Sequence, residues 1–274
     1  MTRNLIGYLK FFLGQAELKV EGMKLGSKTL LVGDIHSKPT HIELLSGYVS
    51  NMNPSSVIVL GDTLFNDWHN QDKLAMMSSS GVPWYLIDGN HDDICMDESI
   101  SQTTITKLYD NVYFVPRGYV HIENGKRFVF IGGAHSIDRG GRTPYLDWWP
   151  NEAPSLGLLN QISYYGKHDD ETIVFAHECP LSWELRNKMS ASESVLDPMQ
   201  VRAGENLREW FGIIAKELDV SRWFHGHHHY RYTGKAFDRP KTVITGLDCT
   251  RTASAKGGKW FDNFENSTYV LDLK

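Results

Sequence analysis

The chain has 274 residues, of which 41% are hydrophobic and 22% charged, the composition of an ordinary globular protein. A formal net charge of −5 excludes a global basic field, so the sequence carries no strong nucleic-acid signal. The three cysteines, an odd number without a C-x-x-C pair, argue against a disulfide framework and favour a reducing, cytoplasmic location.

The predicted elements begin after an N-terminal extension, residues 1–26. Its apolar run is short and broken by Lys10, so we expect neither a signal peptide nor a membrane span there. No other window approaches about 18 unbroken apolar residues, and no membrane partner is expected. Because no linker-like boundary follows, a single domain over residues 1–274 is preferred.

Short runs of β-branched and aromatic residues, each ending in small, acidic or histidine residues, predict buried strands. The first three runs, 29–36, 57–62 and 84–92, alternate with helices predicted at 39–51 and 69–79, which indicates a parallel sheet. Later strands are predicted at 112–122, 127–132, 172–176, 222–225, 242–247 and 268–272, and an amphipathic helix at 202–217. We expect an α/β fold with two facing mixed β-sheets and outer helices. The Gly-, Pro- and Trp-rich segment 136–160 predicts a long loop or small cap.

Polar side chains follow the predicted strands, at the ends where ligands of α/β proteins collect. Any one of them alone has a simpler explanation, such as a helix cap, a turn or a packed histidine. Together they predict a single converging site. Its candidates are Asp34, His36, Asp62, Asn90, His91, His177, His227 and His229.

The chemistry of these candidates favours metal ions. Carboxylate, amide oxygen and imidazole without thiolate suit Mn²⁺, Fe²⁺, Zn²⁺, Co²⁺ or Ni²⁺. A structural zinc site would usually contain cysteine and close at four ligands. Seven donors exceed what one such ion takes, whereas two ions about 3.5–4 Å apart, bridged by a carboxylate, would use them all.

Five short motifs occur in an order along the chain that is similar to the order in a known protein family. "GDIH" (33–36), "GD" (61–62), "GNHD" (89–92), the histidine at 177 and "GHHH" (226–229) resemble the motif set of calcineurin-like metallophosphoesterases, close to small bacterial and phage members. The resemblance implies a four-layer α/β/β/α sandwich. It implies that Asp34, His36 and His229 hold one metal. Asn90, His177 and His227 hold the other, and Asp62 bridges both. His91 is implied to be catalytic, approaching the phosphate and the leaving group.

The implied activity is a dinuclear metal-dependent phosphoesterase in which a metal-bridging hydroxide attacks phosphorus. Mn²⁺ is the first choice of metal, with Fe, Zn, Co and Ni as alternatives. Phosphodiesters, including cyclic nucleotides or nucleotides, are the first substrate hypothesis. The alternatives are a phosphomonoesterase or Ser/Thr phosphoprotein phosphatase and, from another class, a catalytically silent binding scaffold. Intact candidates at all eight positions argue against the scaffold.

Two departures from the family pattern bear on this prediction. Many members carry a second acid where this chain has Phe65; Asn66 or Asp67 could substitute for it or cap the next helix. Asp88 stands where phosphoprotein phosphatases usually have arginine, which argues against that branch.

The loop 132–142 supplies His135, Arg139 and Arg142 as candidate substrate-binding residues, with a solvated loop as the alternative. Trp148 and Trp149 could stack on a base or, as we favour, pack a cap onto the body.

The run "WFHGHHHYRY" (223–232) contains four histidines. If its backbone is strand-like, His227 and His229 share one face and serve one metal each. His228 would then point to solvent or take a supporting role, and His225 could orient a ligand.

Overall fold

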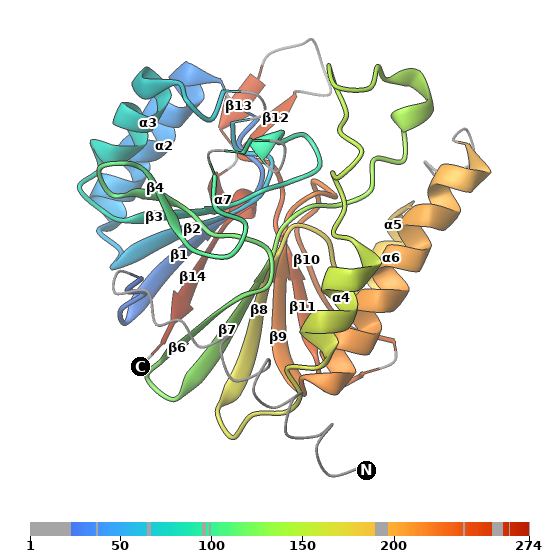
Figure 1. Ribbon diagram of the computed structural model, residues 1–274. Coiled ribbons are helices and arrows are strands. Elements are labelled where there is room, and N and C mark those ends of the chain that lie inside the picture. The colour runs from blue at the N-terminus through green and yellow to red at the C-terminus, as the bar shows by residue number, and fades with distance from the viewer. Residues whose placement is uncertain are drawn as a thin grey trace.

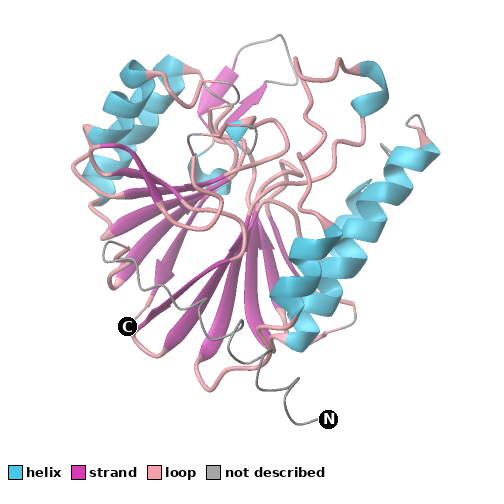
Figure 2. Cartoon of the chain, viewed as in Figure 1, coloured by secondary structure: helices cyan, strands magenta, loops and turns pink. Residues whose placement is uncertain are grey.

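Two six-stranded sheets face each other in the computed structural model (Figures 1 and 2). The structure describes residues 23–36, 38–64, 67–94, 97–98, 100–189, 197–237, 239–253, 260–262 and 264–273. Within them, helices cover the outer face of each sheet, so the layers run helix, sheet, sheet, helix. The predicted four-layer α/β/β/α sandwich with mixed sheets is confirmed.

The first sheet has the strand order β14-β1-β2-β3-β5-β4. Its central strands are parallel, and its two edge strands are antiparallel to their neighbours. The strands are β1 (Lys28–Val32), β2 (Ser56–Leu60), β3 (Trp84–Ile87), β4 (Thr106–Tyr109), β5 (Val112–Phe114) and β14 (Thr268–Asp272). Helices α2 (Pro39–Met52) and α3 (Gln71–Ser78) cover it, close to their predicted positions.

The second sheet has the order β10-β11-β9-β8-β7-β6 and is also parallel at its centre. The strands are β6 (Tyr119–Glu123), β7 (Lys126–Ile131), β8 (Glu171–Ala176), β9 (Val220–His225), β10 (Tyr232–Lys235) and β11 (Val243–Gly246). Helices α4 (Leu156–Ser163) and α6 (Pro198–Glu217) cover it. Shorter elements are η2 (Arg139–Gly141), α5 (Trp183–Met189), β12 (Arg251–Ala253), β13 (Trp260–Asp262) and α7 (Phe264–Ser267).

Successive side chains along the strands alternate between the two faces of each sheet, and together they fill three hydrophobic cores. In β1, Leu30 and Val32 pack against α2 and α3, whereas Leu31 faces the other sheet. In β9, Trp223 packs toward α6 and Phe224 toward the first sheet. Successive side chains of a strand point to opposite faces, so strands that are apolar throughout can bury both. This is why the two sheets stack with helices outside.

The structure differs from the predicted elements at two places. The single strand predicted at 112–122 is two strands, β5 and β6, in different sheets. The chain crosses between the sheets through Pro116, which has no N–H for a ladder, and Gly118, whose φ is 83°. The segment 136–160 is not loop throughout, because α4 begins at Leu156 with Ser155 as its N-cap.

The predicted N-terminal extension is described only from residue 23 onward; residues 1–22 lie outside the described residues. Met23 and Leu25 are buried in the core between the sheets. The N–H groups of Leu25 and Gly26 donate to the Glu123 carboxylate at 2.9 and 3.0 Å. Among the described helices, none combines the length and apolar character needed to cross a membrane.

Candidate metal centre

All seven predicted ligands follow strands that end at the same edge of the sandwich, where loops from both sheets converge (Figure 1). The first sheet supplies the ligands after β1, β2 and β3, and the second sheet supplies those after β8 and β9. In order they are Asp34, His36, Asp62 and Asn90, then His177, His227 and His229. The site is therefore assembled across the interface between the sheets.

The first predicted ligand set lies together. The Nε2 atoms of His36 and His229 are 2.9 Å apart, and His229 Nε2 is 2.9 Å from Asp34 Oδ2. One ligand atom from each of the three residues lies within 4.8 Å of the others. This spacing suits three ligands of one ion.

The second predicted set lies beside the first. His177 Nε2 is 3.0 Å from Asn90 Oδ1 and 3.5 Å from Asp62 Oδ1. The rings of His177 and His227 have centroids 5.0 Å apart. Ligand atoms of Asp34, Asp62 and His177 also lie within 4.8 Å of one another. Asp62 therefore lies between Asp34 of the first group and His177 of the second.

Hydrogen bonds orient these ligands. The Nδ1–H of His177 donates to the Leu60 carbonyl oxygen at 2.6 Å, which leaves Nε2 facing the site. The N–H of His227 donates to both Asp34 oxygens at 3.0 and 3.2 Å, and the N–H of His91 donates to Asp62 Oδ1 at 3.0 Å. These bonds fix the carboxylates before any ion binds.

The backbone of the histidine run is not strand-like, which corrects the geometry assumed from sequence. β9 ends at His225, and His227 and His229 have φ of 65° and 46°. His36 and Asp62 share this left-handed conformation, at 59° and 47°. These side chains thus reach the two donor groups from tight turns and not by alternation along a strand.

The remaining histidines of the run differ in their distance from the two donor groups. His228 Nε2 lies 2.7 Å from Glu178 Oε1, so its ring packs inward and does not point to solvent. Glu178 Oε2 in turn lies 3.8 Å from His227 Nε2. His225 is buried, and burial together with the nearby His228 lowers its pKa to about 3. Its Nε2 lies 2.9 Å from the hydroxyl of Tyr232, outside the two donor groups.

The charges of the two donor groups fit cations. Burial alone would raise the pKa of Asp34, but the hydrogen bond from His229 and the charge of His177 lower it to about 2. Burial alone would lower the pKa of His177, but the Asp62 carboxylate raises it to about 10. Buried carboxylates thus hold protons on neighbouring imidazoles, and a divalent ion would displace those protons.

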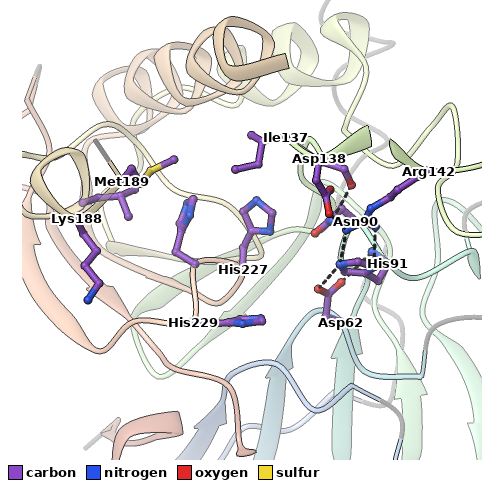
Figure 3. A pocket seen from close by; sticks show the side chains of 13 residues that line it. Asp62, Asn90, His91, Ile137, Asp138, Arg142, Lys188, Met189, His227 and His229 are labelled. Atoms are coloured by element: carbon purple, nitrogen blue, oxygen red, sulfur yellow. Dashed lines mark hydrogen bonds and ion pairs between the residues drawn. The ribbon is translucent and has the colours of Figure 1, made fainter. Parts of the chain in front are cut away.

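His91 lies at the edge of the two groups, with Nε2 4.0 Å from Asp62 Oδ2 (Figure 3). The terminal nitrogens of Arg142 lie 2.9 and 3.2 Å from its two ring nitrogens. Burial lowers the pKa of His91, and the Arg142 charge adds to this against the opposing effect of Asp62. Arg142 is in turn held by the Asp138 carboxylate at 2.8 Å.

The other two candidate substrate residues have different surroundings. The Arg139 guanidinium lies 4.1 Å from the centroid of the Trp148 ring. His135 is buried, and its Nε2 lies at hydrogen-bond distance, 3.0 Å, from Gln200 Oε1. Trp149 is also buried, as expected for packing the loop onto the body.

Asp67 was one of two residues that could replace the second acid of the family pattern, and its contacts can be compared with that prediction. Asp67 pairs with Lys73, and Asn70 caps α3, so Asp67 has neither predicted role. Phe65 and Asn66 lie outside the described residues.

The sequence reasoning missed four residues that support the ligands. Asp92, the last residue of "GNHD", accepts the N–H groups of Gly89, Thr63 and Leu64. Glu178 directly follows the predicted ligand His177. Asp92 and Glu178 could both have been found from the sequence, because each lies beside a predicted site residue. Ser136 lies in the loop 132–142, where the sequence singles out other residues, and Glu152 lies further along the chain in no motif.

A cavity of about 470 Å³ opens over the donor groups (Figure 3). Arg142 and His91 stand at one side of it, and Lys188 and Met189 of α5 at the other, with His227 and His229 between them. Its other lining residues are Asp62, Asn90, Ser136, Ile137, Asp138, Leu185 and His228. The cavity gives a substrate access to the candidate ligands.

The family model that matches this chain identifies its class of protein, the metal-dependent phosphoester hydrolases, and the clustered donors agree with it. The chain belongs to the calcineurin-like phosphoesterase family, whose model matches residues 27–231. No curated protein matches it.

Solved structures with this fold include a Thermus thermophilus protein, 9% identical, with a TM-score of 0.50 over 90% of this chain and 99% of that one. A dimetal phosphatase from Danio rerio is 11% identical, with a TM-score of 0.50 over 82% of this chain and 88% of that one. At such identities the likeness supports the fold alone.

Proposed function

We propose that this protein is a phosphodiesterase that works with two divalent metal ions, Mn²⁺ being the first choice. The observation that carries the proposal is the pair of donor groups that share buried carboxylates under an open cavity. Asp34, His36 and His229 would hold one ion, and Asn90, His177 and His227 the other. Asp62 would hold both. We further propose a single domain over residues 1–274 and, from the cysteine count, a cytoplasmic location.

The bound ions would supply Lewis-acid polarisation of the phosphoryl oxygens and a more acidic water. The chain's own side chains would orient the substrate and protonate the leaving group. Arg142, held by Asp138, can grip a phosphoryl oxygen beside His91. His91 lies on the cavity wall and can give a proton to the departing alkoxide oxygen. The backbone N–H of His91 donates to Asp62 Oδ1 at 3.0 Å, so His91 is held beside the carboxylate proposed to bind both ions.

The cavity walls support a diester substrate. Ile137 and, across the cavity, Leu185 and Met189 of α5 give it apolar sides beyond the donor groups. A second organic group on the phosphate, such as a nucleoside, would bury apolar surface there. A phosphomonoesterase is the second candidate, because Arg142 and Lys188 both line the cavity and their positive charges suit a dianionic phosphate.

The test compares hydrolysis of bis- and mono-p-nitrophenyl phosphate after reconstitution with Mn²⁺, Zn²⁺ or Fe²⁺, followed by cyclic nucleotides. We expect the diester to be preferred. A strong preference for the monoester would overturn the diesterase proposal, and inactivity with every metal would favour a binding scaffold.

His91→Ala separates chemistry from metal binding. We expect two bound metals and a turnover reduced by about 100-fold or more, because the general acid is lost while the ligands remain. Asp62→Ala should lose metal as well. Metal analysis beside kinetics checks both, and full activity in either variant would contradict the assigned roles.

A further inference from the structure

We infer that Glu152 is a positioning residue that acts through Ser136 to aim the amide oxygen of Asn90 at the second metal. The inference rests on the proposed function, since it concerns a ligand of that site. Neither Glu152 nor Ser136 belongs to the motifs that mark the site in the sequence. Both reach it from the loop segment that follows β7.

The three residues form a buried chain of hydrogen bonds. Glu152 is 2% exposed and accepts the Ser136 N–H at 3.0 Å and the Ser136 hydroxyl at 2.7 Å. Ser136, 1% exposed, accepts a hydrogen bond from Asn90 Nδ2 at 2.8 Å. The other end of that amide, Oδ1, lies 3.0 Å from His177 Nε2, within the second donor group.

The polarity of this chain determines which way the amide faces. A carboxylate accepts hydrogen bonds and donates none, so the Ser136 hydroxyl must donate its single proton to Glu152. The hydroxyl oxygen is then left as an acceptor, and only the NH₂ group of Asn90 can satisfy it. Oδ1 is thereby turned toward the site. The reversed amide would point two N–H donors at a cation and could not bind it.

Further contacts fix the position of Glu152. Its backbone carbonyl accepts hydrogen bonds from Arg117 Nη2 at 2.9 Å and from the Ala134 N–H at 3.1 Å. The same guanidinium binds the carboxylate of Asp88, two residues before Asn90, through Nε at 2.9 Å. Arg117 therefore ties the Glu152 backbone to the segment that carries the metal ligand. The Arg139 guanidinium, 3.9 Å from the Glu152 carboxylate, partly offsets the cost of burying this charge.

The test uses Glu152→Gln, which keeps the shape but can both donate and accept, and Ser136→Ala, which removes the hydroxyl. Mn²⁺ binding to the full chain is measured by calorimetric titration and by electron paramagnetic resonance. We expect one of the two Mn²⁺ sites to weaken by about 10–100-fold in each variant, as for other outer-shell partners of ligands, with the other site unchanged. Excess Mn²⁺ should restore most of the turnover. Glu171→Gln, a carboxylate at the far end of β8 that pairs with Arg222, is the matched control and should bind as the wild type does.

Wild-type affinity at both sites in folded variants would overturn the inference, and so would an equal loss at both sites. If Glu152→Gln does not fold, Ser136→Ala decides by the same criteria. A wild-type chain that binds two Mn²⁺ ions and hydrolyses phosphate esters keeps the proposed function even if both variants are unaffected. A wild-type chain that binds none of Mn²⁺, Zn²⁺ and Fe²⁺ would overturn both proposals.

Discussion

The glycines of the motifs are required by how closely the backbone approaches the ligands. A Cβ on Gly89 would stand 2.1 Å from Asp62 Oδ1, and one on Gly226 would stand 2.1 Å from Asp34 Oδ1. Both carboxylates are already fixed by backbone N–H groups. The glycines of "GNHD" and "GHHH" thus reflect the space that a neighbouring ligand occupies.

Gly89→Ala tests this close packing. The added methyl group must displace the Asp62 carboxylate, so we expect loss of metal binding and activity, with about 1–3 kcal/mol less stability from overpacking. Gly47→Ala is the matched control, because a Cβ there meets nothing within 4 Å in helix α2. It should keep full metal content and lose no stability. Metal analysis and urea denaturation of both variants check the prediction; unchanged metal content in Gly89→Ala would contradict it.

At the scale of elements, the pattern of hydrophobic residues is sufficient to predict the long buried strands and the helices that have one apolar face. It failed where a short element depends on distant partners. β4 and β10 are edge strands with little apolar character, and they form because β5 and β11 offer them free edges. The apolar pattern predicts the start of α6 four residues late, because Asp197 and Pro198, its N-cap and first residue, lie before the periodic region.

One contact between elements predicts a pH dependence. Glu123 of β6 accepts N–H groups from Leu25 and Gly26 and lies 2.9 Å from His121 Nε2. Burial would raise its pKa, but these hydrogen bonds, first that of His121, lower it from 4.5. A carboxyl group whose pKa is lowered by folding stabilises the protein above its unfolded pKa, and the effect disappears as pH falls through the folded value.

Glu123→Gln should therefore lower the free energy of unfolding by about 1 kcal/mol near neutral pH, the contribution expected for partly exposed hydrogen bonds. The difference from wild type should shrink below about pH 4.5 and vanish once the carboxyl group is protonated in both the folded and the unfolded chain. Urea denaturation across this range measures it. Glu43→Gln, on an exposed position of α2, is the control and should differ little from wild type throughout. A pH-independent difference for Glu123→Gln would contradict the assignment.

At the scale of the whole molecule, the apolar runs predict the two sheets, and the polar residues at their ends predict that the candidate ligands meet at one edge. Strand ends identify which backbone segments converge. They contain no information on contacts such as that between Arg142 and His91, because these depend on how the loop after β7 folds back over the site. The supporting carboxylates Glu152 and Glu178 escaped prediction for the same reason: their partners come from other loops.

The division of the ligands between the sheets predicts how metal affects the entire fold. Each proposed ion would be bound by residues of both sheets, for example by Asp34 after β1 and His229 after β9. Unfolding separates these ligands, so an ion that binds only the folded chain stabilises it, by about 2.7 kcal/mol at a hundredfold excess over Kd. We expect chelation with EDTA to lower the melting temperature by roughly 5–10 °C, and Mn²⁺ to restore it. The variant Asp62→Asn should melt at nearly the same temperature with Mn²⁺ as with EDTA. If neither Mn²⁺ nor EDTA changes the melting temperature of the wild type, this would argue against an ion that is bound by residues of both sheets.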